Sequence, residues 1–209
     1  MTHDSRMIVV RQTFGDRRKE EIAVLNIECL NPERENNTLR PEELEAQFAG
    51  ALGFVSNTAN LGINWMERYR KHLNQLPEDD HELLYRSGGD PNIHYYQSFW
   101  KLAPDEALLV HLTDIPECET WNLQLSDYWM ESLEFRFFDV CVNKFTAQYE
   151  EDGSVFIVIA GSDPGLRYPN WLNTTGHDQG GMLGRYVGST NPPKEMGARV
   201  VKLSELQSA

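Results

Sequence analysis

The feature that most constrains the fold is a series of short strand-like segments in the second half of the chain. Each has five to seven residues and is rich in β-branched or aromatic side chains. They cover residues 94–100, 106–112, 120–125, 145–149, 155–159, 182–187 and 199–203. Turn-forming residues separate them, and no helical pattern alternates with them as it would in a parallel βαβ sheet. The sequence therefore predicts a mainly β fold, an antiparallel β-sandwich or jelly roll.

Two further elements precede this region. Residues 7–14 and 22–28 are rich in β-branched side chains and are separated by a polar turn, so they predict a β-hairpin within residues 1–30 that joins the sandwich. Residues 41–76 change to a helical period, with apolar side chains at steps of mainly three and four residues. These side chains are Leu44, Phe48, Leu52, Val55, Ala59, Ile63, Met66 and Leu73.

The ends of this helical segment carry the expected charges. Pro41 suits a first helical position, and three glutamates follow it near the positive end of the helix dipole. Basic residues gather at 68–72, near the negative end. Residues 56–58 and Gly62 are poor helix formers, so the segment is either one kinked helix or two.

Length and composition set the class of protein. A chain of 209 residues suits a single domain, here residues 1–209 with a jelly-roll core at 94–203. The net charge of −13 argues against nucleic acid or an anionic membrane as the main partner, and no apolar run approaches membrane-spanning length. Cys29, Cys118 and Cys141 form no CxxC pair, so we predict free thiols and a cytoplasmic location.

Several segments, in order, resemble a bacterial family known as domain of unknown function 1214. They are residues 104–108, 121–125, 129–134, 152–154, 163–165, 170–172 and 176–177. The likeness covers roughly residues 94–209 and implies a C-terminal jelly-roll domain. Many members of the family have further N-terminal sequence, so a pocket shared between two domains there can here be open or completed by a second subunit. The family has no settled activity, so the resemblance implies a fold more than a function.

Established catalytic signatures are missing. The sequence has no GxSxG, no GxxxxGK[ST] and no HExxH motif. His94, His111 and His177 are isolated from one another, so a three-ligand metal site would need distant residues to converge. We therefore predict no metal and no cofactor.

The most informative segment is the long loop at residues 163–181. Long loops inside compact domains are often binding elements. Trp171 can stack on a ring, Asn170 offers donors and acceptors, and His177 can serve as an acid or base because imidazole titrates near neutral pH. Arg185, on the strand that follows, can hold a carboxylate or orient Asp163. The candidate catalytic residues are thus His177, Arg185 and Asp163.

A structural interpretation of the same loop is equally consistent with the sequence. Asp163 can be a turn residue whose carboxylate accepts backbone N–H bonds, or it can pair with Arg185 in a buried ion pair. Trp171 can close the end of the sandwich, and His177 can be an exposed loop residue. The functional interpretation requires Trp171, Asn170, His177 and Arg185 to converge within about 8 Å around a ligand-sized cavity.

Four more residues are candidate ligand contacts: Asn122, Gln124, Trp129 and His111. Residues 121–125 alternate, so the two amides share one face of a strand, which either lines a pocket or meets solvent. Trp129 belongs to an aromatic cluster that the sequence favours as core. The other members are Tyr128, Phe135, Phe137 and Phe138.

Two hypotheses from different classes follow, and the sequence leaves open whether the protein is an enzyme. The first is a small-molecule-binding jelly roll, which can act as a cofactor-independent enzyme if His177 moves a proton. The second is a non-catalytic interaction module in which the helical segment 41–76 presents its apolar face to a second copy.

Overall fold

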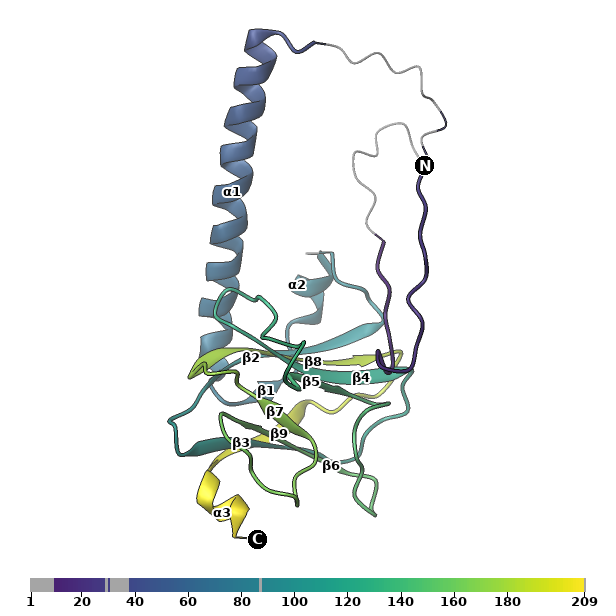
Figure 1. Ribbon diagram of the computed structural model, residues 1–209, viewed down its shortest axis with the longest axis vertical. Coiled ribbons are helices and arrows are strands. Elements are labelled where there is room, and N and C mark those ends of the chain that lie inside the picture. The colour runs from purple at the N-terminus through teal and green to yellow at the C-terminus, as the bar shows by residue number, and fades with distance from the viewer. Residues whose placement is uncertain (1–9, 29, 31–37, 87, 209) are drawn as a thin grey trace.

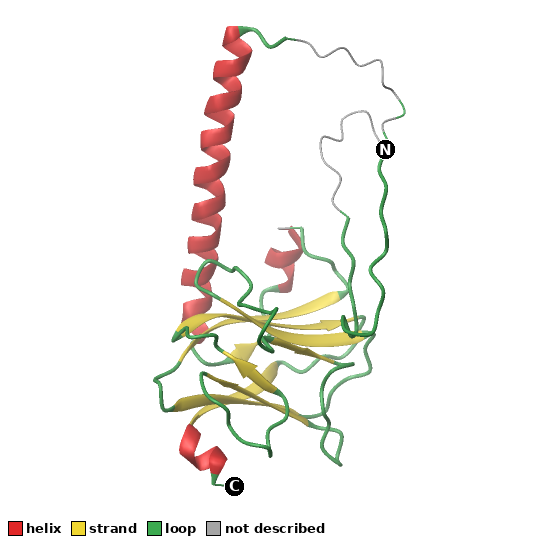
Figure 2. Ribbon diagram, in the orientation of Figure 1, coloured by secondary structure: helices red, strands yellow, loops and turns green. Residues whose placement is uncertain are grey.

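Two β-sheets pack face to face, and one long helix stands out from the outer side of one sheet (Figure 1). This arrangement is seen in a computed structural model, which describes residues 10–28, 30, 38–86 and 88–208. The mainly β sandwich preceded by a helical segment, predicted from the sequence, is confirmed. Figure 2 shows the strands gathered in the sandwich and the helices outside it.

The five-stranded sheet has the order β1-β9-β3-β6-β7, and all its pairs are antiparallel except β6 with β7. Its strands are β1 (Leu76–Pro77), β3 (Glu106–Leu112), β6 (Val155–Ala160), β7 (Trp171–Asn173) and β9 (Glu195–Lys202). The four-stranded sheet has the order β2-β8-β4-β5 and is antiparallel throughout. It consists of β2 (Ile93–Lys101), β4 (Thr120–Ser126), β5 (Cys141–Asn143) and β8 (Gln179–Val187).

The core lies between the two sheets because alternate residues of each strand point inward. In β4 the inward residues are Trp121, Leu123 and Leu125, all fully buried. Leu108 and Val110 of β3 meet them from the opposite sheet in the same apolar cluster. This packing sends the intervening residues of β4 to the outer face of the four-stranded sheet.

Six of the seven predicted strands occur, with ends displaced by up to four residues. The strand predicted at 145–149 is wrong. Asn143 prevents it by closing a turn, in which its Oδ1 accepts hydrogen bonds from the backbone N–H groups of Phe145 and Thr146 at 2.8 and 3.1 Å. The short strands β1, β5 and β7 were not predicted, because two or three residues are too few to show a period.

Helix α1 (Pro41–Tyr69) is a single continuous helix, which decides between the two alternatives left by the sequence. A 3₁₀ turn, η1 (Arg70–His72), extends it. Only its last turns are buried, where Met66 and Tyr69 pack with Phe99 of β2. Gly181 of β8 permits this contact, since a Cβ there would lie 2.7 Å from Cε of Met66. Two short helices, α2 (His81–Arg86) and α3 (Leu203–Gln207), complete the fold.

Residues 10–28 form two extended arms joined by a turn at 15–20, on the same side of the four-stranded sheet as α1 (Figure 1). The turn is attached to β5, since Asn143 Nδ2 donates to the Gly15 carbonyl at 2.8 Å. The arms lie where the sequence predicts a β-hairpin, but no hairpin forms over residues 10–14 and 21–28, and residues 7–9 lie outside the described part. No strand ladder joins arms 10–14 and 21–28, because their apolar side chains have no surface to pack against.

In the described residues, no helix is both long enough and apolar enough to cross a membrane. Cys118 and Cys141 are free thiols, and Cys29 lies outside the described residues.

Candidate functional site

The outer face of the four-stranded sheet carries an unusual set of polar side chains. Strand alternation sends the apolar side chains inward and leaves this set outside. Its members are Tyr95 and Gln97 of β2, Asn122 and Gln124 of β4, Arg185 of β8, and Cys141 and Asn143 of β5. Neighbouring positions follow from the register: Tyr95, Arg185, Asn122 and Asn143 form one row across all four strands.

Arg185 stands at the centre of this row. Its guanidinium lies over the ring of Tyr95, 6.0 Å from the centroid. Burial lowers the pKa of the guanidinium, Tyr95 opposes this shift, and the charge of Arg11 adds to it. Among the described residues the Arg185 side chain forms no salt bridge and no hydrogen bond. A partly buried cation without a carboxylate is unfavourable, so this position is suited to an anion.

Asn122 is the second unsatisfied group, directly beside Arg185 on the neighbouring strand. Its Oδ1 is buried and has no hydrogen-bond partner in the described part of the chain. Two other polar groups of the same face, Asn143 and Gln97, are already occupied. Asn143 holds the turns at Gly15 and Phe145, and the Gln97 Oε1 accepts a hydrogen bond from the Tyr69 hydroxyl of α1. Among the described residues, the unused hydrogen-bonding capacity of this face therefore lies at Arg185 and Asn122, with the Gln124 amide one row away.

We call the group of Arg185, Tyr95, Asn122, Gln124 and Cys141 the Arg185 site. Gln124 and Cys141 are opposite each other in the β4–β5 register, one row away from Asn122. Burial raises the pKa of the Cys141 thiol, so at neutral pH it is mainly protonated and a weak nucleophile. The site can therefore bind an anion and a hydrogen-bond donor, but its thiol is not suited to act as a nucleophile.

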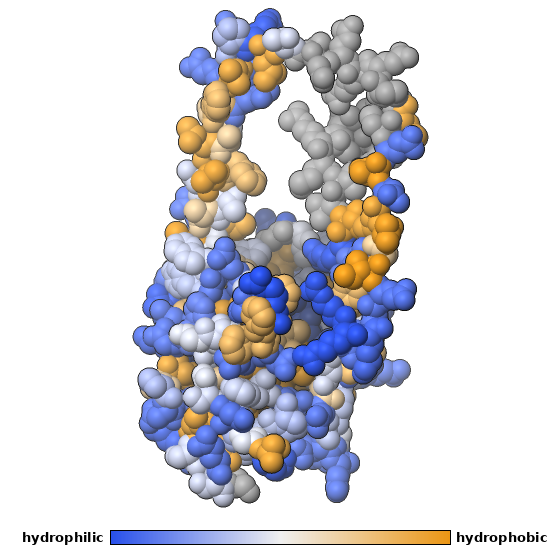
Figure 3. Space-filling view, viewed as in Figure 1, coloured by the Kyte–Doolittle hydropathy of each residue, from blue (hydrophilic) through white to orange (hydrophobic). Residues whose placement is uncertain are grey.

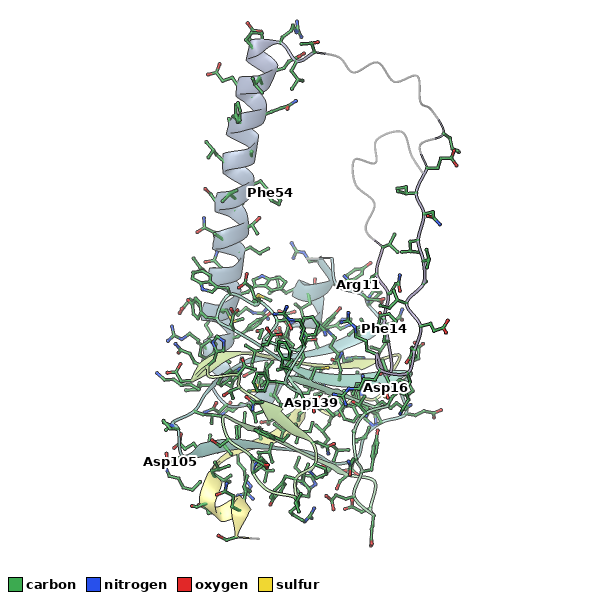
Figure 4. All side chains as sticks on the ribbon, viewed as in Figure 1. Arg11, Phe14, Asp16, Phe54, Asp105 and Asp139 are labelled. Atoms are coloured by element: carbon green, nitrogen blue, oxygen red, sulfur yellow. The ribbon has the colours of Figure 1, made fainter. Side chains whose placement is uncertain are left out.

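A cleft of about 640 Å³ adjoins the Arg185 site and shares Cys141 with it. One wall is formed by the first arm and the turn that follows it, with four basic residues: Arg11, Arg17, Arg18 and Lys19. Arg18 and Lys19 are paired with Asp139 and Asp16, each at 2.9 Å. Figure 4 shows Arg11 just above the four-stranded sheet. The cleft is thus locally basic in a chain whose net charge is −13.

Asn170 and Trp171 lie on the opposite wall of this cleft but serve the fold. Asn170 Nδ2 donates to the carbonyls of Gln148 and Phe156 at 2.8 and 2.9 Å, and its Oδ1 accepts the Gln148 N–H at 2.8 Å. Trp171 Nε1 donates to the Ala160 carbonyl at 3.0 Å, and its ring packs on an outer apolar cluster of the five-stranded sheet. Their polar atoms are committed to the backbone.

His177 and Asp163 are remote from Arg185. His177 is exposed on the turn before β8 and lines a small pocket of about 240 Å³ with Glu106 and Ser162. Arg185 lies six residues beyond Gln179, the first residue of β8, which is about 20 Å along an extended strand. The expected convergence of Trp171, Asn170, His177 and Arg185 therefore does not occur.

Asp163 is an exposed turn residue. Its Oδ1 accepts the Gly165 N–H at 2.7 Å, and it forms no ion pair with Arg185. This contact matches the structural interpretation of the loop, in which the carboxylate caps a turn.

His111 and Trp129 lie apart from the Arg185 site. His111 is on the outer face of the five-stranded sheet, stacked on Phe156 with 3.9 Å between centroids, and its buried Nε2 has no partner in the described residues. Trp129 is 56% exposed. The expectation that its aromatic cluster is core is wrong for four members, since Trp129, Phe135, Phe137 and Phe138 are all exposed. They occupy the loop between β4 and β5, which crosses the outside of the sheet.

Sequence reasoning singled out Arg185, Asn122 and Gln124 but did not link Arg185 to the two amides, and it missed Tyr95, Arg11 and Cys141 as neighbours. Alternation in 94–100 places Tyr95 and Trp100 on opposite faces, but it shows that Tyr95 points outward only once Trp100 is known to be in the core. The position of Tyr95 beside Arg185 follows from the strand register. Among the described residues no three His, Cys, Asp or Glu side chains lie close enough to hold a metal ion.

The fold and this site define a two-sheet β protein with an N-terminal helix and an arginine-centred polar site on an outer sheet face. The chain is similar to an uncharacterised protein from Burkholderia cenocepacia, at 44% identity and a TM-score of 0.83. The match covers 93% of this chain and 53% of that protein, so the chain spans about half its length. The VPA0106 protein from Vibrio parahaemolyticus is less similar, at 14% identity and a TM-score of 0.45 over 80% of this chain and 47% of that one. No family model and no curated protein matches the chain.

Proposed function

We propose that the protein binds a small carboxylate at the Arg185 site. The single observation that carries this proposal is the Arg185 guanidinium, partly buried over Tyr95 and without a carboxylate partner among the described residues. A planar guanidinium presents paired donors that match a carboxylate. Pairing with a carboxylate replaces the favourable interactions with water that the guanidinium loses on burial. No catalytic step is part of this proposal.

The neighbouring amide narrows the ligand class. Asn122 Oδ1 needs a donor, so a ligand whose carboxylate pairs with Arg185 and whose hydroxyl or amino group reaches Asn122 satisfies both groups after a small side-chain rotation. The ring of Tyr95 and the adjoining cleft leave room for an apolar or aromatic body. The ligand class is therefore a hydroxy- or amino-carboxylate.

Thermal denaturation with three matched probes tests this. Mandelate carries a ring, a carboxylate and a hydroxyl; phenylacetate lacks the hydroxyl, and mandelamide lacks the charge. A probe at ten times its dissociation constant stabilises the protein by about 1.4 kcal/mol. We expect the stabilisation to fall in the order mandelate, phenylacetate, mandelamide, and to vanish in Arg185→Met. The matched control Arg199→Met removes an exposed arginine from β9 and keeps the response. Equal responses in Arg185→Met and wild type would contradict the proposal.

A second function, homo-oligomerisation through the helical segment, is favoured by a separate observation. Six large apolar side chains of α1 are 43–72% exposed: Leu44, Phe48, Leu52, Phe54, Val55 and Leu61. Monomers rarely leave so contiguous an apolar surface in water. Light scattering at micromolar concentration should give a mass of at least twice 24.0 kDa. A mass of 24.0 kDa would rule this function out.

We also propose that the chain belongs to the family of domain of unknown function 1214, because the segments around Trp121, Asn170 and His177 resemble that family and stand in the same order. Alignment of this chain with members of that family should match these three positions, and their absence would contradict the membership.

A further inference from the structure

A second arginine, Arg11 of the first arm, lies near Arg185. Its charge lowers the pKa of the Arg185 guanidinium, so the two positive charges are close enough to repel each other. Arg11 also lines the cleft that adjoins the Arg185 site, and it stands just above the four-stranded sheet (Figure 4). Two like charges that face one space are unfavourable unless an anion lies between them.

The first arm is fixed on both sides of this arginine. Below it, the hydrogen bond from Asn143 Nδ2 to the Gly15 carbonyl attaches the arm to the sandwich. Next to it, Gln12 Nε2 donates to the Ala23 carbonyl at 3.0 Å, and its Oε1 accepts the Ala23 N–H at 3.1 Å. Gln12 thus joins the two arms, whereas the side chain of Arg11 forms no salt bridge and no hydrogen bond among the described residues.

No carboxylate of the described chain neutralises this pair of charges. The two acidic residues that line the cleft, Asp16 and Asp139, are already held in ion pairs with other basic residues of the turn, each at 2.9 Å. Figure 3 shows strongly hydrophilic side chains where the arms reach the sandwich, below the apolar side chains of the arms themselves. The positive charge of Arg11 and Arg185 is therefore left uncompensated within the described residues.

The same charges decide between a hydroxyl and an amino group on the ligand. Asn122 Oδ1, beside Arg185 on the neighbouring strand, requires a donor, which either group can supply. An ammonium group would place a third positive charge beside the two guanidinium groups, whereas a hydroxyl group adds no charge. The site therefore favours a hydroxyl group next to the first carboxylate, and a second negative charge elsewhere on the ligand.

We propose that the ligand is a 2-hydroxy-dicarboxylate, whose first carboxylate pairs with Arg185 and whose second carboxylate pairs with Arg11. This inference rests on the carboxylate binding proposed above, and it adds the second charge and the residue that holds it. Arg11 is exposed, so its ion pair is strongly screened by salt, whereas the pair at the partly buried Arg185 is screened less.

Isothermal titration calorimetry on the full chain tests the second charge. Malate and the longer 2-hydroxyglutarate carry both carboxylates, and their terminal amides, malamate and 2-hydroxyglutaramate, keep the shape and the hydroxyl group but lose the second charge. In buffer of about 0.05 M ionic strength, we expect at least one dicarboxylate to bind roughly tenfold more tightly than its amide. At about 0.5 M ionic strength this preference should weaken, because the pair at Arg11 is screened.

Two variants assign the preference to a residue and separate the possible failures. Arg11→Gln should bind the dicarboxylate no more tightly than its amide, with the affinity for the amide unchanged, whereas the matched control Arg199→Gln removes an equal charge from β9 and keeps the preference. A preference that survives in Arg11→Gln would overturn this inference. So would equal affinities for acid and amide in both pairs, and if mandelate still binds through Arg185, the carboxylate binding proposed above stands. If no carboxylate binds wild type, mandelate included, both proposals fail.

Discussion

Replacing Arg185 with methionine should stabilise the ligand-free protein, contrary to the usual effect of a substitution in a partly buried position. Methionine keeps the volume of the aliphatic stem beside Tyr95 and removes a charge that has no ion-pair partner in the described residues. Replacing a buried ion pair by apolar residues of similar volume is often neutral or stabilises proteins by about 1–4 kcal/mol. A single, partly exposed guanidinium belongs at the lower end of this range, near 1 kcal/mol. For a domain of this size that raises the melting temperature by about 2–4 °C.

Urea denaturation at one fixed protein concentration measures this difference, with Arg199→Met as the matched control. Arg199 is exposed and should change stability by no more than about 0.5 kcal/mol in either direction. A carboxylate probe should then stabilise wild type and not Arg185→Met, so that the order of stability reverses when ligand is present. Destabilisation of ligand-free protein by more than about 1 kcal/mol in Arg185→Met would refute the reasoning, because it would mean that the guanidinium is a structural partner.

Three further outcomes follow from the structure. Asn170→Ala should destabilise the protein by about 3 kcal/mol, since three partly buried hydrogen bonds worth about 1 kcal/mol each are lost, and urea denaturation measures this. In circular-dichroism melts Gly180→Ala should prevent stable folding, because a Cβ would lie 2.1 Å from a backbone oxygen, whereas Gly50→Ala on the open side of α1 should stabilise by about 0.8–1 kcal/mol. His177→Ala should leave the mandelate response unchanged, because this side chain lies far from Arg185; a lost response would implicate the loop in binding after all.

Most strands could be predicted from the sequence, because an alternating apolar pattern is a local property. Residues 106–112 are the clearest case, with predicted and observed ends identical. The prediction at 145–149 failed because Asn143 closes a turn through side-chain hydrogen bonds, a contact that periodicity does not detect. The aromatic residues 135–138 were expected inside because aromatics are usually buried, but their loop crosses the outside of a sheet.

The candidate site could be predicted only in part. Alternation places Asn122 and Gln124 on one face, opposite Trp121, and a lone arginine in a strand is a visible signal. Asn170 looked equally suitable for a ligand, yet all its observed bonds go to the backbone. An asparagine in a loop looks the same in the sequence whether it binds a ligand or holds the backbone, so only its contacts in the structure distinguish the two roles.

By itself the sequence determined a mainly β chain with one amphipathic helix, because hydrophobic period depends on residues within a few positions of one another. Tertiary structure alone decided that Arg185 stands between Tyr95 and Asn122, while His177 lies at the far end of the same strand. Strand order and register arise from contacts between segments 60 to 90 residues apart, whose energies depend on the packing of the whole sandwich and not on any local pattern. The same reason explains why α1 is amphipathic in sequence but covered only at one end in the structure.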